Sequence, residues 1–331
     1  MEKNPLPKTA FPAALPAPYR AARTTNRKGK VTRYVHDRLS ANLHRHARAA
    51  RGKPRADYET LLAAPGALDE LRAAEALLFG GADWEAIVPH MDRLHACSGL
   101  HRHVVDFLFL MAASERLRAD YKAAGLPDAL FWDTIADLKF KLIECHDVYG
   151  IWGTFVAFWH PWFYTMRRFK LGRLQYEAIP FKNDAPVTLG GYTVQPGDTV
   201  YNMHIPSCGP LTREARFASY KQAYDFYKKD LGGKPMAFVC HSWLLYPKNR
   251  EILPATLNMV DFINDFHIYK WEEDDVFHDK WRVFGRDFEK PDSALPEDTT
   301  QRRCFKKWLL DGKKTGSGQG IFLYDGERFI K

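Results

Sequence analysis

The stretch FYTMRRFKLGRLQYE, residues 163–177, marks the place where the hydrophobic pattern of the chain changes. From residue 30 to about residue 164, apolar residues recur every three or four positions, as in Val104, Val105, Leu108 and Met111. This spacing predicts helices packed through apolar faces. After residue 168, short apolar runs are bounded by glycine and proline, which is typical of strands mixed with helices. We therefore expect an α+β protein, with a helical domain over residues 31–165 and a mixed-sheet α/β domain over residues 166–331.

Individual elements follow from the same patterns. Asp83 is expected to cap one helix, and Asp128 to cap a helix that runs through Ile143. Residues 1–30 contain five prolines among the first twenty positions and are expected to form an extended arm, either on the surface or mobile. The later strands are expected at 171–179, 199–205, 236–245, 266–271, 282–284 and 320–324, and the later helices at 212–231, 254–263 and 298–310.

The composition limits the classes of protein to consider. The 331 residues are 46% hydrophobic and 27% charged, as in ordinary globular proteins. Five scattered cysteines without a closely spaced pair argue against a disulfide framework and indicate a reducing compartment, the cytoplasm. The densest apolar run, residues 151–164, contains His160 and Pro161 and is too short to span a membrane. Its seven aromatic residues predict a domain interface or, alternatively, a stacking surface for a cofactor.

Charge and histidine content indicate which partners to expect. A formal net charge of +8 would favour an anionic partner such as a nucleotide cofactor, and the basic cluster at residues 20–33 is either solvated surface or a phosphate-binding arm. No nucleic-acid motif is recognised, so no nucleic-acid or membrane partner is expected. Histidine and cysteine are dense at residues 90–103, but they meet no zinc-ligand spacing, and the pairs at 44/46 and 145/146 do not either, so we expect no metal.

Three segments resemble a known family. They are residues 163–177, YNMHIPSCGPLTREA at 201–215, and FVCHSWLLYP at 238–247 followed by ILPATLNMVDF. They resemble a bacterial family of acyltransferase domain-containing proteins, in which an N-acyltransferase-like helical domain precedes a GNAT-like domain. The resemblance implies transfer of an acyl group from acyl-CoA, or another pantetheine thioester, to an amine-bearing small-molecule or peptide acceptor in a cleft between the domains. The alternative is a non-catalytic GNAT-like module that binds a metabolite or a protein partner.

Acyl transfer to an amine needs a proton acceptor, and two residues are candidates. His204 ends a predicted strand, where its near-neutral pKa suits a general base; the alternative is a structural histidine that anchors the following turn. Strand alternation places Arg173, Gln175 and Glu177 on one face of a predicted strand and Tyr176 on the other face. Glu177 is therefore the second candidate base. The alternative is that this polar face is simply exposed to solvent. The candidate acceptor-binding residues are Arg173, Gln175, Asn202 and Ser207.

The resemblance also implies a place for the cofactor. In a GNAT-like fold a central strand splays from its neighbour, and its free backbone groups hold the pantetheine arm; the matching residues are Cys240, His241, Ser242 and Trp243. Cys240 is expected to be a small core residue, with a covalent acyl relay as the alternative. The glycine-rich phosphate loop expected after this strand is replaced by YPKNREILP, where Lys248 and Arg250 could bind phosphate by charge. A glycine-rich stretch at residues 312–320 is expected to be a flexible turn or lid.

Overall fold

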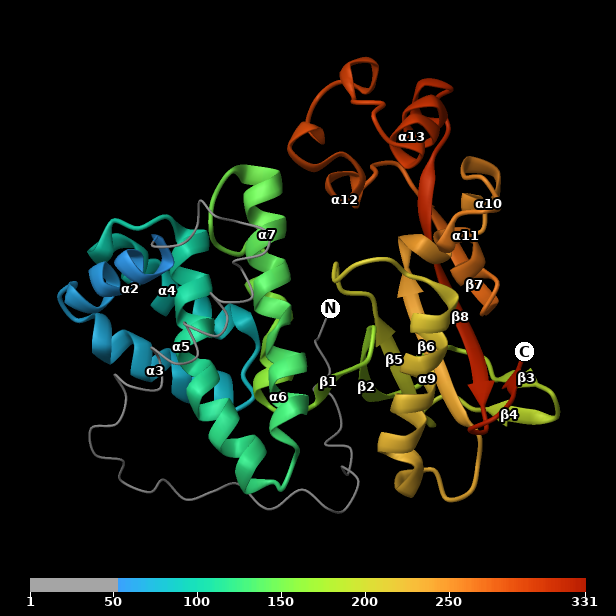
Figure 1. Ribbon diagram of the computed structural model, residues 1–331, viewed down its shortest axis with the longest axis horizontal. Helices are drawn as coiled ribbons and strands as arrows, with labels where there is room; N and C mark the ends of the chain where they lie inside the picture. Colours follow the sequence, from blue (N-terminus) through green and yellow to red (C-terminus); the bar gives the residue numbers. More distant parts are fainter. Residues whose placement is uncertain (1–52) are drawn as a thin grey trace.

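The computed structural model describes residues 53–331, so the arm at residues 1–30, the basic cluster at 20–33 and the histidines at 44 and 46 lie outside the described residues. The first part is helical, as the sequence predicted (Figure 1). Its central helix α5 is buried at every position from Val104 to Met111, so the other helices pack around it. The helices are α2 Lys53–Ala63, α3 Ala67–Phe79, α4 Trp84–Ser98, α5 Arg102–Ala123, α6 Asp128–Ile135, α7 Asp137–Tyr149, η2 Ala157–Trp159 and α8 Pro161–Tyr164.

The expected helix from Asp128 to Ile143 is in fact two helices. Helix α6 ends at Ile135, and α7 begins at Asp137, whose buried side chain accepts a hydrogen bond from Gln175 of the second domain. The break puts Asp137 at the N-terminus of α7, where a carboxylate is stabilised. Its contact with Gln175 also places it where the two domains meet. Helix α4 begins after Asp83 as predicted, although the Asp83 side chain makes no capping hydrogen bond.

The second part is built on one mixed sheet with strand order β1-β2-β5-β6-β8-β7, with β9 paired to β8. Strands β5 and β6 are parallel, and the other neighbouring strands are antiparallel. A separate hairpin of β3 and β4 contributes to the apolar cluster over one face of the sheet. The strands are β1 Arg168–Leu171, β2 Leu174–Pro180, β3 Val187–Leu189, β4 Tyr192–Val194, β5 Thr199–His204, β6 Met236–Ser242, β7 His267–Asp274, β8 Thr315–Tyr324 and β9 Phe329–Ile330.

The long helix α9 lies along the sheet (Figure 1). Its Tyr220 packs against Phe238 and Phe322, on the face of the sheet opposite to the β3–β4 hairpin. Short helices fill the remaining connections. These elements are α9 Arg213–Tyr227, η3 Lys228–Asp230, η4 Trp243–Leu245, α10 Asn249–Ile252, α11 Asn258–Ile263, α12 Lys280–Phe284, η5 Gly285–Asp287, η6 Asp292–Ala294 and α13 Thr300–Leu310.

Several expected strands were wrong in detail. The strand expected at 171–179 is a hairpin, because Gly172 adopts φ +72° and the chain turns there, so Arg173 does not share a strand face with Gln175 and Glu177. The strand expected at 236–245 ends at Ser242, and Trp243 begins the 3₁₀ helix η4. Residues 282–284, expected as a strand, belong to helix α12.

The glycine-rich stretch at 312–320 is not a flexible lid, because its second half opens strand β8. Every second residue at the start of this strand is a glycine, and these glycines share one face: Gly316, Gly318 and Gly320. The helix η4 and Phe266 pack closely against this face. A Cβ atom on Gly318 would lie 2.2 Å from the backbone oxygen of Leu245. Glycine is needed here because another chain segment passes against the strand backbone.

We expect Gly318→Ala to destabilise the protein by about 1–3 kcal/mol, because the added methyl group must push the backbone of η4 away from the sheet. The change can be measured as the shift of the urea unfolding midpoint. Ser317→Ala, one residue earlier on the opposite face, serves as the control and should cost less. An unchanged midpoint in Gly318→Ala would show that η4 moves away from the sheet without a loss of stability.

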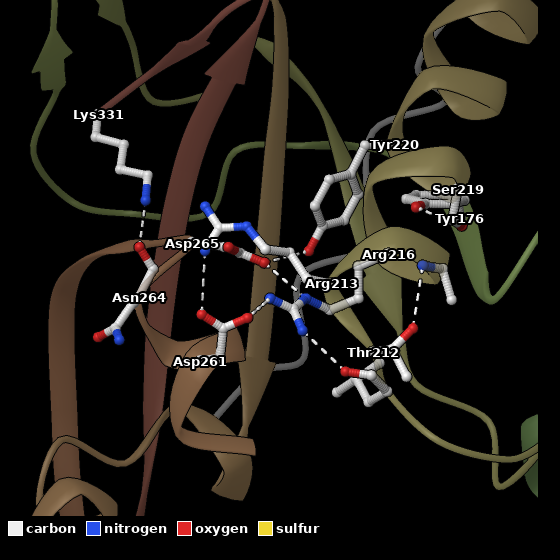
Figure 2. A network of polar contacts seen from close by, with 12 residues as sticks. Tyr176, Thr212, Arg213, Arg216, Ser219, Tyr220, Asp261, Asn264, Asp265 and Lys331 are labelled. Atoms are coloured by element: carbon white, nitrogen blue, oxygen red, sulfur yellow. Dashed lines mark hydrogen bonds and ion pairs between the residues drawn. The ribbon is translucent and has the colours of Figure 1, made fainter. Parts of the chain in front are cut away.

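A buried charge network holds α9 against α11 (Figure 2). Arg216 of α9 is fully buried, and its guanidinium donates to Asp261, Asp265 and the Leu211 backbone oxygen, each at 2.8 Å. The Tyr220 hydroxyl donates a further hydrogen bond to Asp265. The network therefore ties the second half of α11 and the residues that follow it to α9 and to the loop that contains Leu211.

Candidate active site

A cleft of about 1030 Å³ lies between the helical domain and the open end of the sheet. Helix α7 forms one wall, and the ends of β5 and β6 form the floor. The remaining walls come from the starts of α11 and α13 and from α12. The expected cleft between the two domains is therefore present in the structure.

Strands β5 and β6 separate at this cleft. Their parallel pairing is restricted to Tyr201 with Phe238 and Asn202 with Val239. Beyond these two pairs, the strands are no longer hydrogen-bonded to each other. The residues that follow on each strand line the cleft: His204 on β5 and Cys240, His241 and Ser242 on β6. On its other side β6 stays paired with β8 as far as Ser242. The splay that the family resemblance implied is thus observed, and it leaves the β5-facing edge of residues 240–242 outside the ladder.

His204 and Glu177, the two candidate bases, are in direct contact. The β2–β5 register places Gln175 opposite His204, so His204 and Glu177 are diagonal neighbours on one face, and His204 Nε2 lies 2.9 Å from Glu177 Oε1. Glu177 is only 3% exposed, so the solvated-face alternative is wrong. His204 itself lines the cleft, whereas Glu177 lies behind it.

The surroundings of this pair determine its protonation. Burial opposes ionisation of Glu177, but its hydrogen bond with His204 and the charge of Arg168 outweigh burial and lower the Glu177 pKa to about 2. A carboxylate this acidic is a weak base, so the expected role of Glu177 as a proton acceptor is not supported. Its position suits a carboxylate that orients a histidine.

Burial also acts on His204. It lowers the pKa of the imidazole below the ordinary value of 6.5; the hydrogen bond with Glu177 opposes this shift, and the charge of Arg168 adds to it. His204 is therefore neutral at pH 7. A neutral ring that donates from Nε2 to Glu177 keeps its lone pair on Nδ1.

Trp159 completes the surroundings of His204 from the helical domain. Its ring packs edge-on against the imidazole, with centroids 4.6 Å apart, and the Arg168 guanidinium lies 4.0 Å from the centroid of the same ring. Arg168 also donates hydrogen bonds to Glu177 and to the Trp159 backbone oxygen. The aromatic run at 151–164 thus forms part of the domain interface, as predicted, and Trp159 lines the cleft as well.

The four predicted acceptor-binding residues have separate positions. Gln175 and Ser207 line the cleft, where Gln175 donates to Asp137 and Ser207 donates to Glu144. Asn202 does not line it and donates to Glu177 instead. Arg173 lines the cleft as well and donates to the backbone oxygens of Pro206, Gly209 and Pro210, so it holds the loop that follows β5.

The predicted cofactor residues divide into two groups. Cys240, His241, Ser242 and Trp243 all line the cleft. The Cys240 thiol is buried, and burial raises its pKa to about 12, which agrees with a core residue and argues against an acyl relay.

Lys248 and Arg250 do not line the cleft. The Lys248 ammonium lies 2.6 Å from Glu273, and Arg250 donates to Asn264, so both side chains are engaged elsewhere. They are therefore removed from the candidate site. Lys248 and Arg250 were predicted to bind the cofactor because they follow β6 in the sequence, but the segment that contains them does not line the cleft.

Sequence reasoning missed the polar face of α7. Asp137, Lys141 and Glu144 line the cleft although each is less than 10% exposed. Their spacing of four and three residues was a usable signal, because it puts them on one side of a helix. Within residues 53–331, no group of three histidine, cysteine or acidic side chains could hold a metal ion, and no helix has the length and apolar character needed to cross a bilayer.

Comparisons with known proteins define the class. A model of the N-acyltransferase N-terminal domain matches residues 40–166, and a model of the GNAT-like C-terminal domain matches residues 168–322. The described fold, helices followed by a splayed mixed sheet, is the one these two domains imply. The chain belongs to the family that joins an N-acyltransferase N-terminal domain to a GNAT-like C-terminal domain.

Solved structures share this fold along nearly the whole chain. An acyltransferase in complex with decanoyl-CoA and teicoplanin is 22% identical, with a TM-score of 0.66, and the match covers 94% of this chain and 92% of the other. An acyltransferase in complex with CoA and 10C-teicoplanin is 21% identical, with a TM-score of 0.65 and coverage of 88% and 87%. An acyltransferase in complex with decanoyl-CoA is 21% identical, with a TM-score of 0.60 and coverage of 92% and 90%. No curated protein matches the chain.

Proposed function

We propose that the chain is an acyltransferase that moves an acyl group from acyl-CoA to an amine-bearing small-molecule or peptide acceptor. The observation that carries this proposal is the His204–Glu177 pair at the open end of the splayed strands, inside a cleft between the two domains. Solved proteins of the same fold bind CoA or decanoyl-CoA, two of them together with teicoplanin or 10C-teicoplanin, which supports acyl-CoA as the donor.

The proposed reaction uses His204 as general base. The amine nitrogen attacks the thioester carbonyl carbon, a C–N bond forms, and the nitrogen gives a proton to Nδ1 of His204. Glu177 stabilises the imidazolium that results, as an orienting carboxylate does in other histidine-dependent acyl transfers. The C–S bond then breaks, and the CoA thiolate takes a proton from the imidazolium or from water. The amide and free CoA are the products.

The loop between β5 and α9 is the proposed site for the CoA diphosphate. Of the two splayed strands, only β5 leads directly, through the loop at residues 205–212, to a helix as long as 15 residues, and Gly209 in that loop adopts φ +115°. The N-terminus of such a helix presents N–H groups to an anion. In α9 the Ala215 N–H already donates to the Thr212 hydroxyl, which leaves the N–H groups of Arg213 and Glu214 for the diphosphate. The glycine loop that we expected after β6 therefore has its counterpart after β5, where the sequence reads SCGPLT.

The non-catalytic alternative was motivated by the absence of a glycine loop after Leu245 and by the possibility of a filled cleft. The structure places a glycine-containing turn after the other splayed strand, and the cleft has a volume of about 1030 Å³. Neither observation favours a silent module, so we do not propose it.

Calorimetric titration with decanoyl-CoA, CoA and pantetheine tests the donor site. We expect saturable binding of decanoyl-CoA and CoA, much weaker binding of pantetheine because it lacks the diphosphate, and affinities that fall as salt is added. Gly209→Val should weaken CoA binding more than pantetheine binding, because a β-branched residue is strained at this φ. Equal affinity for CoA and pantetheine would contradict a diphosphate site.

The pH dependence of the reaction follows from His204. Because its pKa is lowered, the neutral base persists below pH 6.5, and kcat/KM should fall only as the pH drops through that lowered pKa. The hydrogen bond and charge of Glu177 raise the His204 pKa, so Glu177→Gln should move the acid limb to still lower pH and reduce the rate. A pH–rate profile with decanoyl-CoA measures both. Once the rate is divided by the fraction of unprotonated acceptor amine at each pH, an acid limb centred above pH 6.5 in the wild type would contradict His204 as the base.

A further inference from the structure

The α7 wall of the cleft contains a buried ammonium group to which the proposed mechanism gives no role. Lys141 is 7% exposed and lines the cleft, whereas lysine is rarely buried unless it is paired. Within the described residues, its one hydrogen bond goes to Glu144 Oε2 at 2.9 Å. An ammonium group has three N–H donors, so Lys141 keeps donors for another partner.

The carboxyl groups beside Lys141 can only accept hydrogen bonds. Glu144 accepts from Lys141 with one oxygen and from the Ser207 hydroxyl with the other. Asp137 accepts from Gln175 with Oδ1, while its buried Oδ2 lies 3.4 Å from His160 Nε2 and accepts no hydrogen bond within the described residues. Of these three α7 side chains, Lys141 is the one that has N–H donors left for a molecule in the cleft.

The location of Lys141 connects it to the reacting centre. Asp137 is bound to Gln175, which stands opposite His204 in the β2–β5 register. Lys141 follows Asp137 by four residues, about one helical turn or 5–6 Å along α7. Lys141 and His204 line the same cleft, so a molecule that presents its amine to His204 can extend along α7 toward Lys141.

The charge of the wall selects the chemistry of the group that Lys141 can bind. Lys141 lies between the carboxyl side chains of Asp137 and Glu144 on α7. The three arginines that also line the cleft are engaged elsewhere, Arg173 with backbone oxygens, Arg282 with Asp279 and Arg302 with Asp298. Beside two carboxyl groups, an uncharged oxygen is a better partner for the Lys141 N–H donors than an anionic group, which those carboxyl groups would repel.

We propose that Lys141 is an acceptor-binding residue and that it donates a hydrogen bond to an uncharged oxygen, an amide carbonyl or a hydroxyl, two to three bonds from the reacting amine. This inference rests on the proposed function and narrows its substrate class. Amines with a neighbouring amide or hydroxyl are accepted, and α-amino acids with a free carboxylate are disfavoured.

The test compares four small amines as acceptors with decanoyl-CoA: glycinamide, ethanolamine, glycine and ethylamine. In Lys141→Met we expect KM for glycinamide and ethanolamine to rise about 10- to 100-fold, the range for a lost hydrogen bond from a charged donor, and KM for ethylamine to stay within about twofold. Each amine is compared only with itself in the wild type, so differences in amine basicity cancel. Glycinamide and ethanolamine separate the amide carbonyl from the hydroxyl as the bound oxygen.

Controls separate binding from folding. Lys139→Met makes the same change on the same helix at a position outside the cleft lining and should leave all four KM values unchanged. Lys141→Met leaves Glu144 without its cation, so Lys141→Met with Glu144→Gln provides a second variant in which no unpaired buried charge remains. Both Lys141 variants should lose the preference for oxygen-bearing amines.

The outcomes are distinguishable from failure of the proposed function. Equal changes for all four amines, no change for any, or a wild-type preference for glycine over glycinamide would overturn the proposal. If no amine is acylated, the proposed function fails, and chemical-shift titration of the protein with the same four amines still tests the subsite. Selective weakening of glycinamide and ethanolamine binding in Lys141→Met would then support it, and unselective binding would overturn it.

Discussion

Replacing His204 with alanine is expected to reduce kcat for transfer from decanoyl-CoA by about 10²- to 10⁴-fold, the usual contribution of a general base. The loss should fall on kcat and not on donor affinity, because in the proposed site the CoA diphosphate and pantetheine are held by the backbone of the β5–α9 loop and of β6. Thiol release at saturating decanoyl-CoA measures the rate, and calorimetry with CoA measures the affinity.

His267→Ala is the control for this prediction. His267 is an exposed residue of strand β7 outside the cleft lining, so its loss should leave the rate unchanged. A His204→Ala variant that keeps its rate within about threefold would make His204 the structural histidine that the sequence left open as the alternative. Glu177→Gln should lie between wild type and His204→Ala, because the base is retained but the imidazolium loses its counter-charge.

Replacing Arg216 with methionine is expected to lower the free energy of unfolding by about 3–5 kcal/mol, the cost of leaving a buried charge unpaired. Asp265 is 3% exposed and would lose the guanidinium that compensates its carboxylate. Urea unfolding monitored by tryptophan fluorescence measures the loss.

Two further variants test this explanation. In Arg216→Met with Asp265→Asn the orphaned charge is gone, so part of the stability should return. Arg213→Ala removes a neighbouring ion pair whose arginine side chain is 60% exposed, and it should cost less than about 1 kcal/mol. Equal losses for Arg213→Ala and Arg216→Met would show that burial of the network does not set its contribution.

The sequence predicted the features that depend on the spacing of neighbouring residues, namely the helices and the faces of the strands. The three- to four-residue repeat gave the helical domain, and strand alternation gave the shared face of Gln175 and Glu177 and the end position of His204. Their contact could not be derived, because it depends on the register between β2 and β5, which are separated by the β3–β4 hairpin. The low pKa of Glu177 could not be derived for the same reason: Arg168 and His204, which keep it ionised, come from other strands.

The rest depended on long-range packing. Gly316, Gly318 and Gly320 have the composition of a flexible loop, and only the passage of η4 across β8 explains why these glycines form a strand. The phosphate loop was sought after β6 because the family resemblance was matched to that strand, although the sequence already predicted a long helix at 212–231 directly after the strand at 199–205. The polar face of α7 was overlooked because its partners, Gln175 and Ser207, lie in the other domain.

The central claim is that this cleft transfers an acyl group from acyl-CoA to an amine. Mass spectrometry of a reaction containing the purified protein, decanoyl-CoA and glycinamide tests it most directly. The account predicts one N-decanoyl amide for each CoA released, at a rate that depends on His204. Stable binding of decanoyl-CoA without amide formation from any of the four amines, or release of CoA only as hydrolysis to decanoic acid, would contradict it.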